Sequence, residues 1–148
     1  MAISVREAKS QDLEALLGLY RSLHPADPVL APGVAERTYR QMLSMPLLTI
    51  YVLEDEMNVV ATATLTVIPN LTRGAAPYAL IENVVVAEER RGRGVGKQLM
   101  SGVLAAAWRA GCYKATLTTG SSDPAVHGFY ESAGFSATVK TAYFARPN

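Results

Sequence analysis

The chain has 148 residues, of which 49% are hydrophobic and 18% charged, and its formal net charge is +1 at pH 7. This length and hydrophobicity predict one domain over residues 1–148, and the near-neutral charge offers no global attraction to nucleic acid or to an anionic membrane. Cys112 is the only cysteine, which excludes an intramolecular disulfide and favours a reducing compartment. Because the chain also lacks a signal-peptide pattern and a membrane-length apolar run, we expect a cytoplasmic location.

The first half of the chain predicts a strand, two helices and a hairpin. Alternating apolar residues indicate the strand, and apolar residues three and four apart indicate the first helix. Prolines end that helix, and β-branched residues on both sides of a polar loop predict the hairpin. In order, we expect a strand over 3–6, a helix capped by Ser10, a loop over 24–32, a helix over 34–45, hairpin strands over 49–53 and 59–68, and a loop over 70–77.

The second half predicts a buried strand, a charged turn and a long helix. Val84, Val85 and Val86 are consecutive, which suits a strand that is covered on both faces. A short helix with proline in its first turn and Gly134 after its end follows later. In order, we expect a strand over 78–86, a turn over 88–96, a helix over 94–110, a strand over 115–119, a helix over 124–133 and a strand or hairpin over 135–144.

The turn between the valine strand and the long helix predicts a phosphate site. Gly92, Gly94 and Gly96 stand at alternate positions, so backbone N–H groups can approach an anion without obstruction by Cβ atoms. The start of a helix presents free N–H groups and the positive end of the dipole, and Arg91, Arg93 and Lys97 add positive charge. The spacing matches neither a P-loop nor a dinucleotide fingerprint. The alternative is a solvated basic turn whose glycines serve only its geometry.

Two motifs in this order resemble the GNAT superfamily of acetyl-CoA-dependent N-acetyltransferases. The segment Arg91-Gly92-Arg93-Gly94-Val95-Gly96 fits the family signature [QR]-x-x-G-x-[GA], and residues 129–135 fit its F-Y-x-x-x-G-F segment. The resemblance implies an α/β fold with a mixed, splayed sheet of six or seven strands and about four flanking helices. It further implies direct transfer of an acetyl group from acetyl-CoA to a primary amine, in a ternary complex. The cofactor-binding residues that we expect are Val84, Val85, Val86, Arg91, Gly92, Arg93, Gly94, Val95, Gly96, Lys97, Ser121 and Tyr130.

Two residues are candidates for acid and base catalysis. Glu82 lies in an apolar strand, where burial of an acid is costly without partners, so it is a candidate base for the amine; the alternative is an acid that faces a solvated cleft or forms a salt bridge. The resemblance implies that Tyr130 protonates the leaving sulfur and that an N–H near residues 83–85 stabilises the oxyanion. Tyr130 can otherwise be a core aromatic residue.

Other polar residues carry weaker interpretations. The chain has only two histidines, His24 and His127, so we expect no metal site, and we interpret His127 as a surface or cleft residue. Cys112 could in principle carry an acyl group, but a packed small residue is the favoured interpretation. Ser121 and its neighbour Ser122 follow a strand, and in the family this loop often contacts CoA or substrate.

The acceptor stays open at this stage. Residues 81–86 (I-E-N-V-V-V) and 111–114 (G-C-Y-K) resemble glucosamine-6-phosphate N-acetyltransferases, although Asn83 replaces an acidic residue of that family. The loop over 119–126 is more similar to aminoalkylphosphonate or aminoglycoside acetyltransferases. Arg73 could pair with an anionic acceptor or lie solvated in its loop. We expect a small amine rather than a protein, and a homodimer in which residues 138–144 take part.

Two alternatives come from other functional classes. A catalytically silent acyl-CoA-binding or sensing module would keep the glycine turn and would not need Glu82 or Tyr130. A nucleic-acid patch formed by the basic residues of the turn fits poorly, because the net charge is near zero and no aromatic residue lies beside the cluster.

Overall fold

The computed structural model describes residues 3–148, which divide into two compact units. The first unit extends to Leu117 and holds a five-stranded sheet with four α-helices. The second unit, Thr118–Asn148, holds the helix α5 (Pro124–Ser132). None of the helices within these residues combines the length and hydropathy that crossing a membrane requires.

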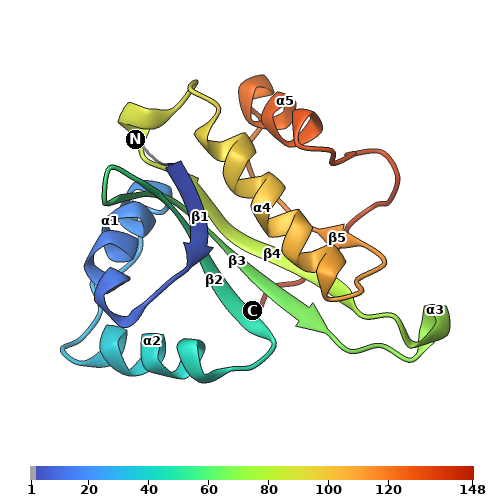
Figure 1. The fold of residues 1–148 in the computed structure, drawn as a ribbon, viewed down its shortest axis with the longest axis horizontal. Helices are drawn as coiled ribbons and strands as arrows, with labels where there is room; N and C mark the ends of the chain where they lie inside the picture. Colours follow the sequence, from blue (N-terminus) through green and yellow to red (C-terminus); the bar gives the residue numbers. More distant parts are fainter. Residues whose placement is uncertain (1–2) are drawn as a thin grey trace. The chain divides into compact units, whose positions relative to one another are not determined.

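The strands of the first unit form one mixed sheet in the order β1-β2-β3-β4-β5 (Figure 1). Strands β1 to β4 are antiparallel to their neighbours, whereas β5 is parallel to β4. Strand β4 therefore has a neighbour on each side at its first residues. Of the three valines predicted to be covered on both faces, Val85 is buried, whereas Val84 and Val86 are only partly buried. The bounds are β1 (Ile3–Glu7), β2 (Leu48–Asp55), β3 (Asn58–Ile68), β4 (Tyr78–Val86) and β5 (Ala115–Thr116).

Helices cover both faces of the sheet, because side chains along each strand alternate between the faces. On β2, Ile50 and Val52 join a buried cluster with Leu16 of α1 and Tyr39 of α2. The intervening Tyr51 lines a cavity beneath α4, so α4 covers the opposite face (Figure 1). The helices are α1 (Leu13–Leu23), α2 (Val34–Ser44), the single turn α3 (Thr72–Ala75) and α4 (Val95–Arg109).

The helix α4 lies close to the sheet because one of its residues has no side chain. A Cβ atom on Gly102 would lie 2.9 Å from Cγ1 of Val5 on β1, so a larger residue would push the helix away. The buried face of α4 includes Leu99, Met100 and Val103, none of which is exposed to solvent. The helical spacing of Val95, Leu99, Val103, Ala106 and Ala110 in the sequence predicts a stripe that shares Leu99 and Val103 with this face.

The hairpin between β2 and β3 closes through a two-residue turn. Asp55 pairs with Asn58, and the intervening Glu56 and Met57 have φ angles of 51° and 69°. Two left-handed residues produce the twist that suits a tight antiparallel hairpin. The hairpin is therefore confirmed, with strands longer than the sequence predicts.

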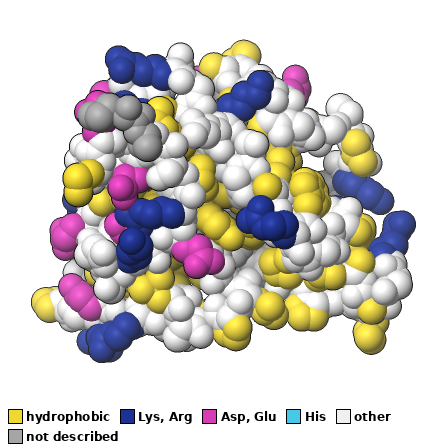
Figure 2. All heavy atoms as spheres, in the orientation of Figure 1, with side chains coloured by type: hydrophobic (Ala, Val, Ile, Leu, Met, Phe, Trp, Pro, Cys, Tyr) yellow, Lys and Arg dark blue, Asp and Glu magenta, His cyan; other side chains and the backbone are white. Residues whose placement is uncertain are grey.

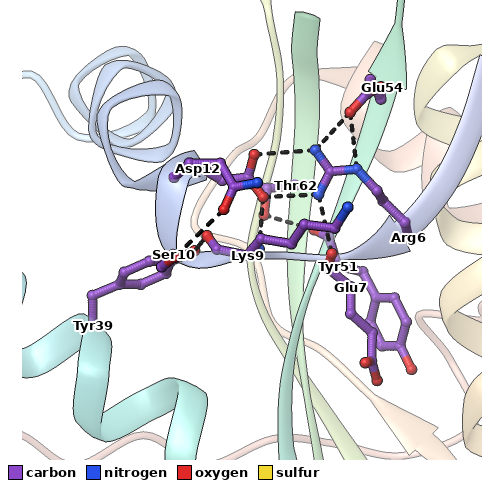
Figure 3. Close-up of polar contacts among 10 residues, drawn as sticks. Arg6, Glu7, Lys9, Ser10, Asp12, Tyr39, Tyr51, Glu54 and Thr62 are labelled. Carbon is purple, nitrogen blue, oxygen red and sulfur yellow. Dashed lines mark hydrogen bonds and ion pairs between the residues drawn. The ribbon is translucent and has the colours of Figure 1, made fainter. Parts of the chain in front are cut away.

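A polar network ties β1, β2 and the start of α1 together (Figure 3). The Arg6 guanidinium donates to the Asp12 carboxylate at 2.8 and 3.1 Å and to Glu54 Oε2 at 2.6 and 2.9 Å. Asp12 is 6% exposed and also accepts from the Lys9 N–H at 2.6 Å. Hydrogen bonding to Arg6 holds the pKa of Asp12 below its usual value. Figure 2 shows acidic and basic side chains intermixed over this part of the surface.

The same network corrects one prediction about the start of α1. A short 3-10 helix, η1 (Ser10–Asp12), precedes α1, and Asp12 is the N-cap residue of α1. The Ser10 hydroxyl contacts the Gln11 side chain instead of the helix backbone. The predicted capping by Ser10 is therefore wrong, because the Asp12 carboxylate takes the backbone N–H of Lys9 and organises this turn.

The predicted count of six or seven strands is also wrong, since residues 3–148 form five. The strand predicted over 115–119 is confined to Ala115–Thr116, and residues 135–144 form neither strand nor hairpin. In that segment Val139 and Tyr143 are 73% and 94% exposed. An alternating pattern becomes a strand only when a partner satisfies its backbone N–H and C=O groups, and the described chain offers this segment no such partner.

Candidate active site

The middle of β4 carries a β-bulge beside Glu82. Thr64 of β3 pairs with Glu82, whereas Thr62 pairs with Val85, so two β4 residues lie opposite one β3 residue. Asn83 adopts a φ of 54°, a left-handed conformation that asparagine and aspartate tolerate better than most residues. The bulge therefore interrupts the ladder at residues 83–84 and leaves Glu82 at its edge, where it is exposed.

The other edge of β4 is open beyond its first residues. Strand β5 pairs only with Ala79 and Leu80, and no strand of residues 3–148 pairs with the rest of β4 on that side. The backbone from Ile81 to Val86 can therefore bind an extended ligand as an added strand would bind. This open edge runs toward the glycine turn that follows β4.

The glycine turn has the conformation that an anion site requires. Gly92 and Gly94 have φ angles of 74° and 78°, and Cβ atoms there would meet no other part of the protein within 4 Å. Gly94 is the N-cap of α4, and no side chain caps that helix. The first N–H groups of α4 are therefore without intrahelical partners at the positive end of its dipole. Phosphate groups fit such a position.

The basic residues of the turn divide into fixed and free ones. Arg90 pairs with Asp55 at the end of β2, and Arg91 donates from Nε to the Val86 carbonyl at 3.2 Å. Arg93 and Lys97 are exposed and make no ion pair with any of residues 3–148. Two cations next to the free N–H groups of α4 make the turn suitable for the pyrophosphate of acetyl-CoA.

In the second unit, Tyr130 lies on α5 among aromatic rings. Its ring centroid is 4.9 Å from that of Phe129 and 6.1 Å from that of Phe135, the latter in an edge-on arrangement. Burial raises the pKa of Tyr130, and its hydroxyl, like that of any tyrosine, is protonated at neutral pH. The side chain can therefore serve as a proton donor, the property that the predicted acid role needs.

The loop before α5 is organised by its own polar groups. Asp123 Oδ1 accepts from the Ala125 N–H at 2.9 Å and caps α5, where Pro124 occupies the first turn as predicted. Ser121 Oγ accepts from the Asp123 N–H at 3.1 Å, and the His127 ring nitrogen Nε2 lies 2.7 Å from the Ser121 carbonyl oxygen. Ser121 and His127 thus have structural partners within the loop, while the neighbouring Ser122 is exposed.

Two other sequence candidates are engaged elsewhere. Cys112 is 8% exposed, and burial raises the pKa of its thiol, which disfavours the nucleophilic thiolate. Arg73 lies over the Tyr113 ring, 5.5 Å from its centroid. Within residues 3–148 no cluster of three histidine, cysteine or acidic side chains suits a metal ion.

A separate apolar cavity of about 510 Å³ lies beneath the C-terminal end of α4. It is lined by the start of β2, the end of β3 and the loop that follows, including Tyr51, Val67 and Asn70. Helix α4 begins at the glycine turn and ends at this cavity, so the two lie apart. The open edge of β4 and the glycine turn carry the groups suited to acyl transfer, whereas this cavity has no free charged group in its lining.

Sequence reasoning did not identify two hydroxyl groups near Glu82. Thr64 lies directly across the β3–β4 ladder from Glu82, and Tyr20 of α1 lies close to the Thr64 hydroxyl. The Thr64 Oγ1 and the Tyr20 hydroxyl are buried and have no hydrogen-bond partner among residues 3–148. The strand register brings these residues together, and local spacing does not show it.

Comparisons with known proteins agree with the geometry. The chain matches the model of the Acetyltransferase (GNAT) family over residues 14–135. It is 30% identical over 135 residues to a glucosamine 6-phosphate N-acetyltransferase of Trypanosoma brucei brucei, covering 91% of this chain and 90% of that protein. A solved structure named "Putative acetyltransferase from Agrobacterium tumefaciens str. C58" is 50% identical, with a TM-score of 0.92 over 98% of this chain and all of that one. The aminoglycoside N-acetyltransferase AAC(6')-Iy, solved in complex with CoA, shares the fold at a TM-score of 0.80 and 20% identity, covering 98% of this chain and 95% of that one.

Proposed function

The chain belongs to the GNAT family of acetyltransferases, which take their acetyl group from acetyl-CoA, and we propose that it transfers this group directly to the primary amine of a small molecule. The observation that carries the proposal is the continuity of three features in one stretch of chain. The bulge beside Glu82, the open edge of β4 and the uncapped glycine turn follow one another over residues 82–97. Together they suit the acetyl end, the pantetheine arm and the pyrophosphate of one acetyl-CoA molecule.

The proposed binding of the donor uses backbone groups first. N–H groups of residues 92–96 and the side chains of Arg91, Arg93 and Lys97 would hold the pyrophosphate, since helix N-termini and cations favour anions. Residues Val84, Val85 and Val86 would pair with the pantetheine arm along the open edge. Ser121 is proposed as a further contact, although its hydroxyl already accepts from the loop backbone.

The proposed chemistry assigns roles to Glu82, to a backbone N–H group and to Tyr130. Glu82, exposed at the bulge, would accept the proton that the amine must lose before it attacks, directly or through water. An N–H in the interrupted ladder at residues 83–85 would stabilise the oxyanion that develops on the carbonyl. Tyr130 would protonate the departing sulfur, because a tyrosine hydroxyl carries its proton at neutral pH.

An amino sugar is the acceptor class that we propose. The support is the 30% identity, over nearly the whole length of both chains, to the trypanosomal glucosamine 6-phosphate N-acetyltransferase. Asn83 departs from the acidic residue of that family, and its left-handed φ of 54° gives a structural reason for the exchange, because asparagine and aspartate both suit that conformation. An aminoglycoside is the second acceptor to test, given the fold shared with aminoglycoside acetyltransferases.

The direct test is acetyl transfer with a panel of amines, detected as product mass. The panel contains glucosamine-6-phosphate, an aminoglycoside, an aminoalkylphosphonate, a polyamine and a lysine peptide. We expect one class to be acetylated, Glu82→Gln to lower kcat by roughly 10²-fold or more, and Tyr130→Phe to lower it by a similar factor, with little change in the affinity for acetyl-CoA. Tight binding of acetyl-CoA without transfer to any amine would favour the silent-module alternative.

We also propose a homodimer that uses residues 138–144. The apolar side chains Val139, Tyr143 and Phe144 of this segment are 71–94% exposed and have no partner strand in the described chain. The mass in solution tests this proposal, and Tyr143→Ser with Phe144→Ser should convert a dimer into a monomer. We also propose a cytoplasmic location, because the single cysteine, Cys112, favours a reducing compartment.

A further inference from the structure

Two buried hydroxyl groups, one of them on the residue opposite Glu82, lack the partners that buried polar groups normally have. Thr64 is 5% exposed, and its Oγ1 accepts or donates no hydrogen bond within residues 3–148. The same is true of the hydroxyl of Tyr20 on α1. Most buried hydroxyls in folded proteins are hydrogen-bonded, so an unpartnered pair calls for an explanation.

The neighbouring Thr62 shows that this face of the sheet can satisfy a threonine. Thr62 lies two residues before Thr64 on the same face of β3 and is fully buried. Its Oγ1 donates to the Tyr51 carbonyl at 2.8 Å, as Figure 3 shows. The lack of a partner is therefore specific to Thr64 and is not a property of buried threonines on this strand.

The register places Thr64 beside the proposed base. Thr64 and Glu82 are directly opposite each other on neighbouring antiparallel strands, so their side chains share one face and their Cβ atoms are about 4.5–5.5 Å apart. Tyr20 lies near Thr64 and belongs to α1, the helix that packs against both β3 and β4. Burial raises the pKa of Tyr20, and the nearby Thr64 and Thr62 hydroxyls oppose that rise. Thr64 is thus the neighbour of both Glu82 and Tyr20.

We propose that Thr64 and Tyr20 are positioning residues for Glu82, arranged as a chain of two hydrogen bonds. The Thr64 hydroxyl donates to the Glu82 carboxylate, and the Tyr20 hydroxyl donates to Thr64 Oγ1. The Thr64 hydroxyl and the Glu82 carboxylate are not hydrogen-bonded in the structure, so the proposed bond requires a change of rotamer in Thr64 or Glu82. No proton moves along the chain; it holds the carboxylate in one orientation and stabilises its ionised form. This inference depends on the role of Glu82 proposed above.

Within the first unit, no other charged side chain accounts for holding the Glu82 carboxylate in one orientation. Of the titratable side chains on α1, Tyr20 faces the sheet, whereas Glu14 and Arg21 are exposed. Strands β3 and β5 carry no charged side chain, and α4, with Lys97 and Arg109, covers the opposite face. In the first unit, the groups that face Glu82 from β3 and α1 are thus the two hydroxyls.

The test compares Thr64→Val with Thr64→Ser, using the pH dependence of kcat/KM. Valine keeps the shape of threonine and removes the hydroxyl, so the Glu82 carboxylate loses a donor. We expect the acidic limb of the profile to move up by roughly 0.5–1 pH unit and kcat to fall about fivefold, with KM for acetyl-CoA unchanged. Serine should restore both values, and Tyr20→Phe should shift the limb in the same direction by less.

Two further variants separate this inference from the proposed base itself. Thr62→Val removes a partnered hydroxyl from the same face and should lower thermal stability without moving the acidic limb. In a Glu82→Gln background, Thr64→Val should cause no further loss of kcat, because the group it positions is absent. If Glu82→Gln alone has no effect, the proposed function fails. If Glu82→Gln is impaired but Thr64→Val behaves like Thr62→Val, the positioning role is overturned.

Discussion

The basic side chains that lie against carboxylates at the β1–β2 end of the sheet and the free ones at the start of α4 are used differently. Arg6 is shared between the carboxylates of Asp12 and Glu54, and Arg90 is paired with Asp55. Arg93 and Lys97, only a few residues after Arg90, have no such partner within residues 3–148. Sequence composition treats all of these residues alike. Their partners separate the cations that hold elements together from the cations that remain available to an anionic ligand.

The surroundings of a charged side chain therefore indicate whether it holds elements of the fold together or is available to a ligand. A carboxylate that is 6% exposed, such as Asp12, needs a permanent cation, since an unpaired charge in that position is costly. An exposed cation beside free helix N–H groups costs little without a ligand and attracts a phosphate when one is present. The following variants test whether this division holds.

The largest expected effect is on stability, from Arg6→Met. Methionine keeps much of the aliphatic packing but leaves the Asp12 and Glu54 carboxylates without their cation. We expect the free energy of unfolding, measured with urea, to fall by about 2–3 kcal/mol. The double variant Arg6→Met with Asp12→Asn also removes the unpaired Asp12 charge, so it should recover part of this loss. A single variant as stable as the parent would show that the network contributes nothing to the fold.

A tenfold effect on the donor is expected from Arg93→Ala combined with Lys97→Ala. Each exposed cation near a phosphate contributes roughly 0.5–1 kcal/mol, so KM for acetyl-CoA should rise about tenfold and less at high salt. The melting temperature should stay within about 1 °C of the parent, since neither side chain forms an ion pair with any residue from 3 to 148. Arg40→Ala, an exposed arginine on α2, is the matched control and should leave KM unchanged. Equal effects in both variants would indicate a general loss of charge and no localised site.

The sequence predicted most of what local periodicity can specify. The amphipathic stripe of α4, the β-branched hairpin and the proline and glycine that bound α5 all appear where residue spacing places them. Each of these features depends on neighbours a few residues apart. The strand or hairpin predicted over 135–144 is wrong because an alternating pattern does not supply the partner strand that it needs.

The details beside Glu82 could not be predicted for a similar reason. The bulge depends on one register shift between β3 and β4, and the left-handed Asn83 is visible only once that register is known. The approach of Tyr20 to Thr64 joins a helix and a strand that are distant in sequence, so no local pattern indicates it. The glycine turn could be found because all of its groups lie within a few residues of one another.

The smallest expected effect comes from replacing either of two glycines by alanine. This pair tests most directly whether the free cations of the turn belong to a phosphate site. Gly94 in the turn and Gly111 after α4 both have left-handed φ angles, 78° and 84°, and open space where a Cβ would lie. Alanine at either position should therefore cost a similar amount of stability, about 1 kcal/mol, through backbone strain alone. Only Gly94→Ala should also raise KM for acetyl-CoA, because only that Cβ would obstruct an anion at the start of α4. If both variants lose stability and neither changes KM, Gly94 serves only the geometry of the turn. The proposal that the turn and its free cations bind phosphate would then lose its main argument.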